Sequence, residues 1–207
     1  HRIARRQRQM CIRDRPITGR VISESGVTFE GVAIGTDDSK ILISNSAGFG
    51  FISTLSNAIS NQKKGKQFMR VPEGSNVISP VTINDNHKFV AATFSTQDNK
   101  GKVSNKMLIF PIEELPVLPK GRGNKLISIS TKAFKEKSEF MMDVCCLAED
   151  SKLHIYHEGK TGGKTWTIKE LEEYITSRAK RGRVLPTGYN GMIKLEEIEK
   201  TKDAAPE

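Results

Sequence analysis

The residues with the clearest chemical potential are lysines and arginines that cluster with glycine in three short segments, which we call basic boxes. Glycine lets backbone amides approach a phosphate closely, and the cationic side chains neutralise its charge. The boxes therefore predict contact with a duplex backbone. Their sequences are Lys63-Lys64-Gly65-Lys66, Lys120-Gly121-Arg122-Gly123-Asn124-Lys125 and Arg178-Ala179-Lys180-Arg181-Gly182-Arg183.

The alternative interpretation is that each box is an ordinary solvated turn, which is how most isolated cationic clusters are used. Position in the sequence argues against it, because the boxes recur at the same place in successive units, with a fainter copy at Thr18-Gly19-Arg20. The spacings are about 46, 59 and 58 residues, close to the period of a propeller blade. Units closed around an axis would bring the charges to one rim. The predicted DNA-binding residues are Lys63, Lys64, Lys66, Lys120, Arg122, Lys125, Arg178, Lys180, Arg181 and Arg183.

A second candidate for chemistry is the segment Gly159 to Thr165, which ends in the Gly-Lys-Thr of a phosphate loop. A Walker loop needs a glycine five residues before Gly163, and that position is Glu158, whose charge would repel phosphate. The segment also joins two strand-like stretches instead of opening a helix. We interpret it as a hairpin turn, with a nucleotide-dependent enzyme as the weaker alternative.

No metal or catalytic site is predicted. His154 and His157 have the spacing that places two side chains on opposite faces of a strand, which is unsuitable for one metal ion. Cys145 and Cys146 are adjacent in a predicted strand, so their side chains point to opposite faces as well. The nucleophile signature Gly-x-Ser-x-Gly does not occur.

The formal net charge of +9 points to a polyanionic partner, but its distribution is uneven. Residues 1–15 carry six arginines against one aspartate, about five of the nine excess charges. A nucleic-acid arm, a targeting peptide and foreign sequence are the three interpretations. The run from Arg6 to Asp14 resembles a translated sequencing adapter, so we expect residues 1–15 to be a non-native, disordered leader and exclude it from fold reasoning.

The remaining chain predicts an all-β fold of short strands separated by turns rich in Gly, Asn and Pro. We expect a partial blade at 16–39, blades at about 40–86, 87–150 and 151–199, and a disordered tail at 200–207. The strand over 77–83 contains Pro80, which predicts a sheet edge or a bulge. Residues 95–106 are expected to form a long polar turn, and 126–129 a strand. No apolar run is long enough to span a bilayer, so the cytoplasm is the expected location.

The sequence resembles the C-terminal domain of the A subunit of bacterial DNA topoisomerase IV, within the gyrase A and topoisomerase IV A family. The resemblance covers residues 16–200 and is most specific at Gly48-Phe49-Gly50-Phe51, at Phe110-Pro111 and at the second box. It implies a β-pinwheel, a propeller-like ring of four-stranded blades that share strands with their neighbours, here incomplete on its N-terminal side.

The same resemblance implies a function in duplex DNA binding and bending on a basic rim. The whole enzyme would be a type II topoisomerase of two A and two B subunits that uses ATP and Mg²⁺ in decatenation and supercoil relaxation. Those cofactors and the catalytic residues are expected in other segments, with none in this fragment. The resemblance also implies association with the chromosome, a condensin-like partner protein and peripheral association with the inner membrane.

One departure from the family concerns gyrase. Gyrase A carries a Gln-Arg-Arg-Gly-Gly-Lys-Gly box, of which the nearest counterpart here is Lys120 to Lys125. The difference favours topoisomerase IV over a gyrase A domain and argues against strong chiral wrapping. A protein-interaction module that docks an acidic chromosome-associated partner remains the alternative from another class.

Overall fold

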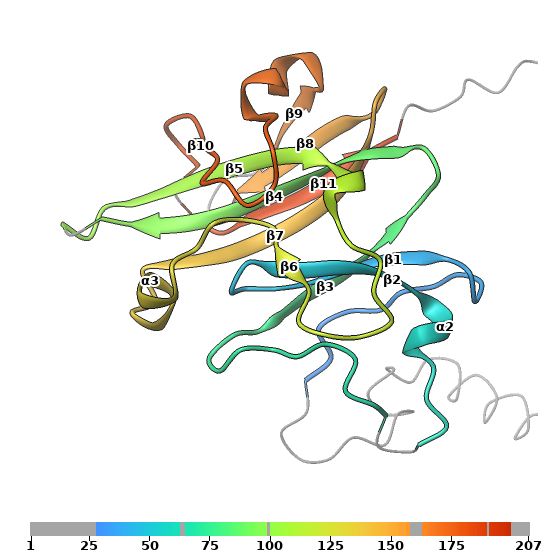
Figure 1. The fold of residues 1–207 in the computed structure, drawn as a ribbon. Helices are drawn as coiled ribbons and strands as arrows, with labels where there is room; N and C mark the ends of the chain where they lie inside the picture. The colour runs from blue at the N-terminus through green and yellow to red at the C-terminus, as the bar shows by residue number, and fades with distance from the viewer. Residues whose placement is uncertain (1–27, 63–64, 99, 158–162, 190, 200–207) are drawn as a thin grey trace, which may run out of the picture.

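The computed structural model describes residues 28–62, 65–98, 100–157, 163–189 and 191–199, which contain three antiparallel sheets (Figure 1). The first sheet has the order β3 (Val77–Ile83), β1 (Lys40–Asn45), β2 (Phe49–Thr54) and β6 (Asn124–Lys125). The second has the order β10 (Arg183–Val184), β5 (Val103–Pro111), β4 (His87–Gln97) and β7 (Glu139–Ala148). The third has the order β11 (Ile193–Ile198), β8 (Lys152–His157) and β9 (Lys164–Thr167).

Short helical turns connect the strands. They are α2 (Leu55–Ala58), the 3-10 turn η2 (Ile112–Glu114), α3 (Thr131–Lys135) and the 3-10 turn η3 (Lys169–Tyr174). Each sheet has one such turn after an inner or edge strand: α2 follows β2 in the first sheet, η2 follows β5 in the second, and η3 follows β9 in the third after one residue. The described residues include no helix with the length and apolar character needed to cross a bilayer.

The first two sheets are each completed by a strand from the following unit. β6 belongs to the second box and pairs with β2, Gly50 facing Asn124. β10 belongs to the third box and pairs with β5 in the same way, Met107 facing Arg183. The strand sharing implied by the resemblance is therefore present, and the boxes are the segments that are shared.

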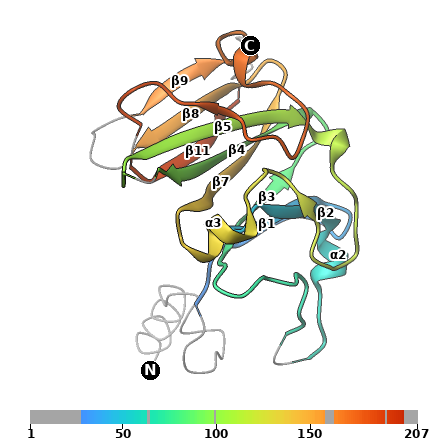
Figure 2. The same cartoon turned by 60° about the vertical axis from the view of Figure 1, so that its left-hand side comes forward.

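The second sheet contributes side chains to two hydrophobic cores. Figure 2 shows its strands β4 and β5 between β1, β2 and β3 of the first sheet and β8 and β9 of the third. In β5, Leu108 and Phe110 pack into the core shared with the first sheet, whereas Met107 and Ile109 pack into the core shared with the third. Since successive side chains of a strand alternate between its faces, the apolar run 107–110 buries both. The adjacent Cys145 and Cys146 of β7 divide between the two cores as predicted, and both are free thiols.

Two carboxylates join β7 to β11. Asp143 of β7 accepts hydrogen bonds from the backbone N–H groups of Val144, at 2.9 Å, and of Leu195 in β11, at 2.8 Å. Glu197 of β11 accepts from the Ala148 N–H at 2.7 Å and contacts His87 Nε2 at 2.7 Å. Burial raises the pKa of the Asp143 carboxyl, and its two backbone hydrogen bonds oppose that rise.

Pro80 sits where its missing N–H is tolerated. β3 is an edge strand of the first sheet, and its register with β1 shifts between Leu42 and Ser44, opposite Pro80. The predicted edge and the predicted bulge are both present. Proline is tolerated at such a position because it has no N–H to donate to a neighbouring strand.

Two expectations about local structure are wrong. Residues 95–106 form no long turn, because β4 runs to Gln97 and β5 starts at Val103. The Asp98 carboxylate closes a tight turn by accepting from the N–H groups of Lys100 and Lys102, so the polar residues flanking it can remain in strands. Residues 126–129 are not a strand either; they are mostly buried and bond to neighbouring loops, with Leu126 N–H donating to Gly48 O at 2.7 Å.

Residues 28–39, the described part of the predicted partial blade, contain no strand. The apolar side chains of Phe29, Val32 and Ile34 in this segment are 46%, 66% and 81% exposed. The leader 1–15, residues 16–27 of the partial blade and the tail 200–207 lie outside the described residues.

Candidate nucleic-acid interface

Backbone hydrogen bonds hold the basic boxes side by side. Just beyond the first box, Arg70 N–H donates to Gly121 O at 2.8 Å, and Gly121 N–H donates to Phe68 O at 3.2 Å. Just beyond the second box the pattern recurs, since Ser128 N–H donates to Lys180 O at 3.0 Å and Ala179 N–H to Leu126 O at 2.9 Å. The three basic boxes, from three successive units, therefore lie side by side. We call the surface formed by the boxes and the residues that join them the basic band.

The box glycines serve two different purposes. A Cβ added at Gly123 would lie 2.4 Å from the Gly50 carbonyl oxygen, and one at Gly182 would lie 2.4 Å from the Met107 carbonyl oxygen. These two glycines allow a shared strand to approach the preceding sheet, a role that the phosphate-cradle interpretation missed. Gly65 and Gly121 also have positive φ, but nothing lies within 4 Å of a Cβ built there, so the side of each residue where a side chain would lie is open.

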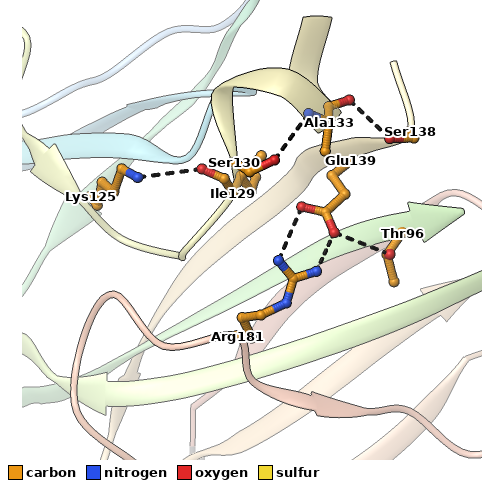
Figure 3. Close-up of polar contacts among 8 residues, drawn as sticks. All are labelled: Thr96, Lys125, Ile129, Ser130, Ala133, Ser138, Glu139 and Arg181. Atoms are coloured by element: carbon orange, nitrogen blue, oxygen red, sulfur yellow. Dashed lines mark hydrogen bonds and ion pairs between the residues drawn. The ribbon is translucent and has the colours of Figure 1, made fainter. Parts of the chain in front are cut away.

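The second box presents cations that face solvent. Lys120, Arg122 and Lys125 are exposed. The Arg122 guanidinium lies over the Phe49 ring, 3.9 Å from its centroid, and this contact holds the side chain by cation–π attraction. Lys125 Nζ donates to the backbone oxygen of Ile129 at 3.4 Å (Figure 3).

The third box is held more firmly by its surroundings. Arg178 donates from Nε to Glu114 O at 3.0 Å and from Nη1 to Lys125 O at 2.6 Å. The Arg181 guanidinium forms an ion pair with Glu139, which also accepts from Thr96 (Figure 3). Arg183 approaches Glu173 at 3.7 Å, in a pair exposed on both sides.

Of the ten predicted DNA-binding residues, the structure describes eight, because Lys63 and Lys64 lie outside the described residues. Lys66 is exposed beside Gly65, and Lys180 is exposed within the third box. The structure therefore brings eight of them to one band: Lys66, Lys120, Arg122, Lys125, Arg178, Lys180, Arg181 and Arg183.

Two residues of this band were not predicted. Arg70 is exposed and its backbone joins the first box to the second. Phe49, from the Gly-Phe-Gly-Phe turn, supports Arg122. The sequence signal for Arg70 was available, since it follows Lys66 by four residues, but the pairing of Phe49 with Arg122 depends on strand sharing across about 70 residues of chain.

The phosphate-loop candidate connects β8 to β9, which pair antiparallel with Ile155 facing Lys164, so the hairpin interpretation of this connection is confirmed. Residues 158–162 of the loop lie outside the described residues. Lys164 Nζ lies over the Trp166 ring, 4.5 Å from its centroid.

The histidines of β8 also make local contacts. His154 Nδ1 is 2.7 Å from Thr165 Oγ1, and His157 packs edge-on against Tyr189. Within the described ranges, no group of three or more His, Cys, Asp or Glu side chains is placed to hold a metal ion.

Comparison with known proteins relates most of the chain to one enzyme subunit. No family model matches the sequence. The A subunit of DNA topoisomerase 4 from Haemophilus influenzae is 30% identical over 186 residues, which are 89% of this chain and 23% of the relative. The Salmonella typhimurium and Escherichia coli K12 proteins of the same name are 31% and 30% identical over 184 residues. The chain thus spans about a quarter of the length of these curated relatives.

Solved structures identify the fold. The E. coli ParC C-terminal domain superposes with a TM-score of 0.73 at 26% identity, covering 89% of this chain and 71% of that one. A C-terminal domain of DNA topoisomerase IV matches with a TM-score of 0.59 at 12% identity, covering 78% of this chain and 47% of that one. The antiparallel sheets with exchanged strands define a β-pinwheel domain. The chain is homologous to the C-terminal domain of the A subunit of DNA topoisomerase IV.

Proposed function

We propose that this domain binds duplex DNA along the basic band, bends it there, and so helps a topoisomerase IV holoenzyme to choose its substrates. The observation that carries the proposal is the side-by-side arrangement of the boxes, joined by the Arg70–Gly121 and Ser128–Lys180 hydrogen bonds. A row of exposed cations releases condensed counterions when it neutralises successive phosphates, and that release favours binding.

The catalytic work belongs to other parts of the proposed enzyme. Two A subunits would break one duplex and two B subunits would hydrolyse ATP, with Mg²⁺, while a second duplex passes through the break. This domain supplies no residue to that chemistry; its contribution is to hold a curved or crossing duplex near the site of cleavage. The partners are therefore duplex DNA, a second A subunit, and the B subunits, at the bacterial chromosome in the cytoplasm.

A salt titration tests DNA binding directly. Fluorescence anisotropy of a labelled duplex should give a log affinity that falls linearly with log salt concentration, with a slope of about −0.9 for each phosphate neutralised. The titration should be run on the full chain and on a variant in which the six arginines of residues 1–15 are glutamine, because that leader would bind DNA on its own. Loss of all binding in the glutamine variant, with the fold intact by circular dichroism, would refute the proposal.

A matched pair of triple variants locates the contact. Lys120→Ala/Arg122→Ala/Lys125→Ala should weaken binding and reduce the slope by about two to three. Lys88→Ala/Lys102→Ala/Lys152→Ala removes the same charge from exposed positions outside the boxes and should change the slope much less. Equal losses would mean that binding follows net charge and not the band.

The acidic-partner alternative is distinguished by competition. Polyglutamate offers carboxylates without the regular phosphate spacing of a duplex, so it should compete weakly with labelled DNA. Competition by polyglutamate at concentrations equivalent in charge to the duplex would favour a protein-docking role. Bending is measured separately, as an increase in energy transfer between dyes at the two duplex ends.

A further inference from the structure

The two ends of the basic band differ in how fully their cations are already engaged. At the third-box end, the Arg178 guanidinium donates hydrogen bonds to the carbonyl oxygens of Glu114 and Lys125. Its backbone N–H donates to the Glu114 carboxylate at 2.7 Å. These contacts connect the third box to η2 and to the second box. A phosphate would have to displace them to reach Arg178.

Arg181 is engaged more strongly still. Its partner Glu139 has a side chain only 8% exposed, whereas the Arg181 side chain is 48% exposed. Withdrawing the guanidinium toward a phosphate would leave a buried carboxylate without its counter-charge, and uncompensated buried charges are among the most costly defects in a protein. Arg183 is partly neutralised by Glu173, though this exposed pair is weak.

The first- and second-box end is arranged in the opposite way. Among the described residues, the ion pairs of the boxes involve Arg181 and Arg183, and none involves Lys66, Lys120 or Arg122. Arg122 instead rests on the Phe49 ring at 3.9 Å. The ring covers one face of the guanidinium, and within the described part of the chain no ion pair engages its N–H groups, so the side chain is held in place while these donors can still bind a phosphate.

We propose that the band is divided: duplex phosphates contact its first- and second-box end, with Arg122 as the anchor and Phe49 as the residue that positions it, while Arg178 and Arg181 form a clamp between blades that takes no phosphate. This inference rests on the proposed DNA binding. It predicts a DNA track that begins at the edge of the first sheet, where β6 pairs with β2, and weakens toward the edge of the second sheet, where β10 pairs with β5.

Single variants of the full chain separate the two ends. Arg122→Ala should lower duplex affinity and reduce the salt slope by about 0.9, with little change in the urea midpoint. Arg181→Ala should leave the slope unchanged and lower the urea midpoint. A slope reduced equally by both variants would overturn the division of the band while leaving DNA binding established, whereas absence of binding in the chain whose six leader arginines are glutamine would refute the proposed function itself.

Arg181→Ala could fail to fold, so a second variant keeps the test decisive. Arg181→Met/Glu139→Leu removes both charges together, leaves the net charge unchanged and leaves no buried carboxylate behind, a replacement that proteins often tolerate. It should bind duplex with the affinity and slope of the unaltered chain. A folded double variant with a slope smaller by about 0.9 would show that Arg181 does contact phosphate.

The positioning role of Phe49 is tested by a double-mutant cycle. Phe49→Leu preserves an apolar side chain but removes the ring face, so it should weaken duplex binding in the unaltered chain. In the Arg122→Ala background the same change should have no further effect, because the side chain that it positions is gone. Additive losses of affinity would show that Phe49 acts independently of Arg122 and would remove it from the anchor.

Discussion

At the residue scale, Asp143 makes the stability of the domain depend on pH in an unusual direction. Burial raises the pKa of this carboxyl, so the folded chain retains the proton at pH values where the unfolded chain has lost it. The free energy of unfolding therefore falls as pH rises through that interval. The contribution is fully present below the unfolded pKa and is lost above the folded one.

Replacement of Asp143 by asparagine tests this sign. An asparagine side chain does not titrate, so the difference in unfolding free energy between the unaltered chain and Asp143→Asn should shrink as pH rises from about 3.5 to 7. Urea titrations at several pH values measure it. A difference that stays constant across that range would show that the Asp143 pKa is not raised, whatever the absolute stability of the variant.

Residue chemistry was predictable where local rules decide it and not where long-range contacts do. Pro80 correctly predicted a sheet edge and a bulge, and the adjacent Cys145 and Cys146 correctly predicted side chains on opposite faces. Both predictions follow from strand geometry alone. The partners of Arg178 and Arg181 could not be foreseen, since Glu114 and Glu139 lie 64 and 42 residues away in the sequence.

At the scale of elements, the shared strands depend on glycine. Gly123 has φ of 77° and lies against the Gly50 carbonyl, so an added Cβ meets both backbone strain and a steric clash. Gly123→Ala should lower the free energy of unfolding by about 2–4 kcal/mol, from the two effects together. Urea denaturation followed by circular dichroism is the measurement.

Gly65→Ala is the matched control for this change. Gly65 has a similar φ of 72° but open space around a Cβ, so only the backbone cost of about 1–2 kcal/mol applies. If both variants lost the same stability, the close approach of β6 to β2 would contribute nothing beyond backbone strain.

Strands were predicted well where the sequence has a strong apolar pattern. They were predicted poorly where hydrogen-bond partners from other parts of the chain decide whether a strand forms. The strands of β1, β2 and β8 appear in the sequence as apolar stretches and are present. Residues 126–129 have the same apolar character, but their hydrogen bonds go to loops of two other units, so no strand forms. The polar ends of β4 and β5 were missed because their pairing is imposed by the hairpin turn at Asp98.

At the scale of the whole molecule, the second sheet couples the two cores. Its β5 and β7 strands contribute side chains to both, so loss of the third sheet would expose Met107, Ile109 and Cys145 to water. Burial of such side chains dominates folding free energy. We therefore expect the sheets to unfold together.

Trp166, the single tryptophan, reports on the third sheet, whereas far-ultraviolet circular dichroism reports on all three. The urea midpoints from the two signals should coincide, as they do in a two-state transition. A fluorescence midpoint at clearly lower urea would show that the third sheet unfolds separately and that the middle sheet does not couple the cores.

Strand sharing also bears on how the domain forms during its synthesis. The first sheet needs β6 from residues 124–125, and the second needs β10 from residues 183–184. Because the chain leaves the ribosome N-terminus first, neither of these two sheets can add its last strand until the following unit has been synthesised. Each of these sheets is thus completed one unit later than its own strands are synthesised, and the segments that complete them belong to the second and third basic boxes.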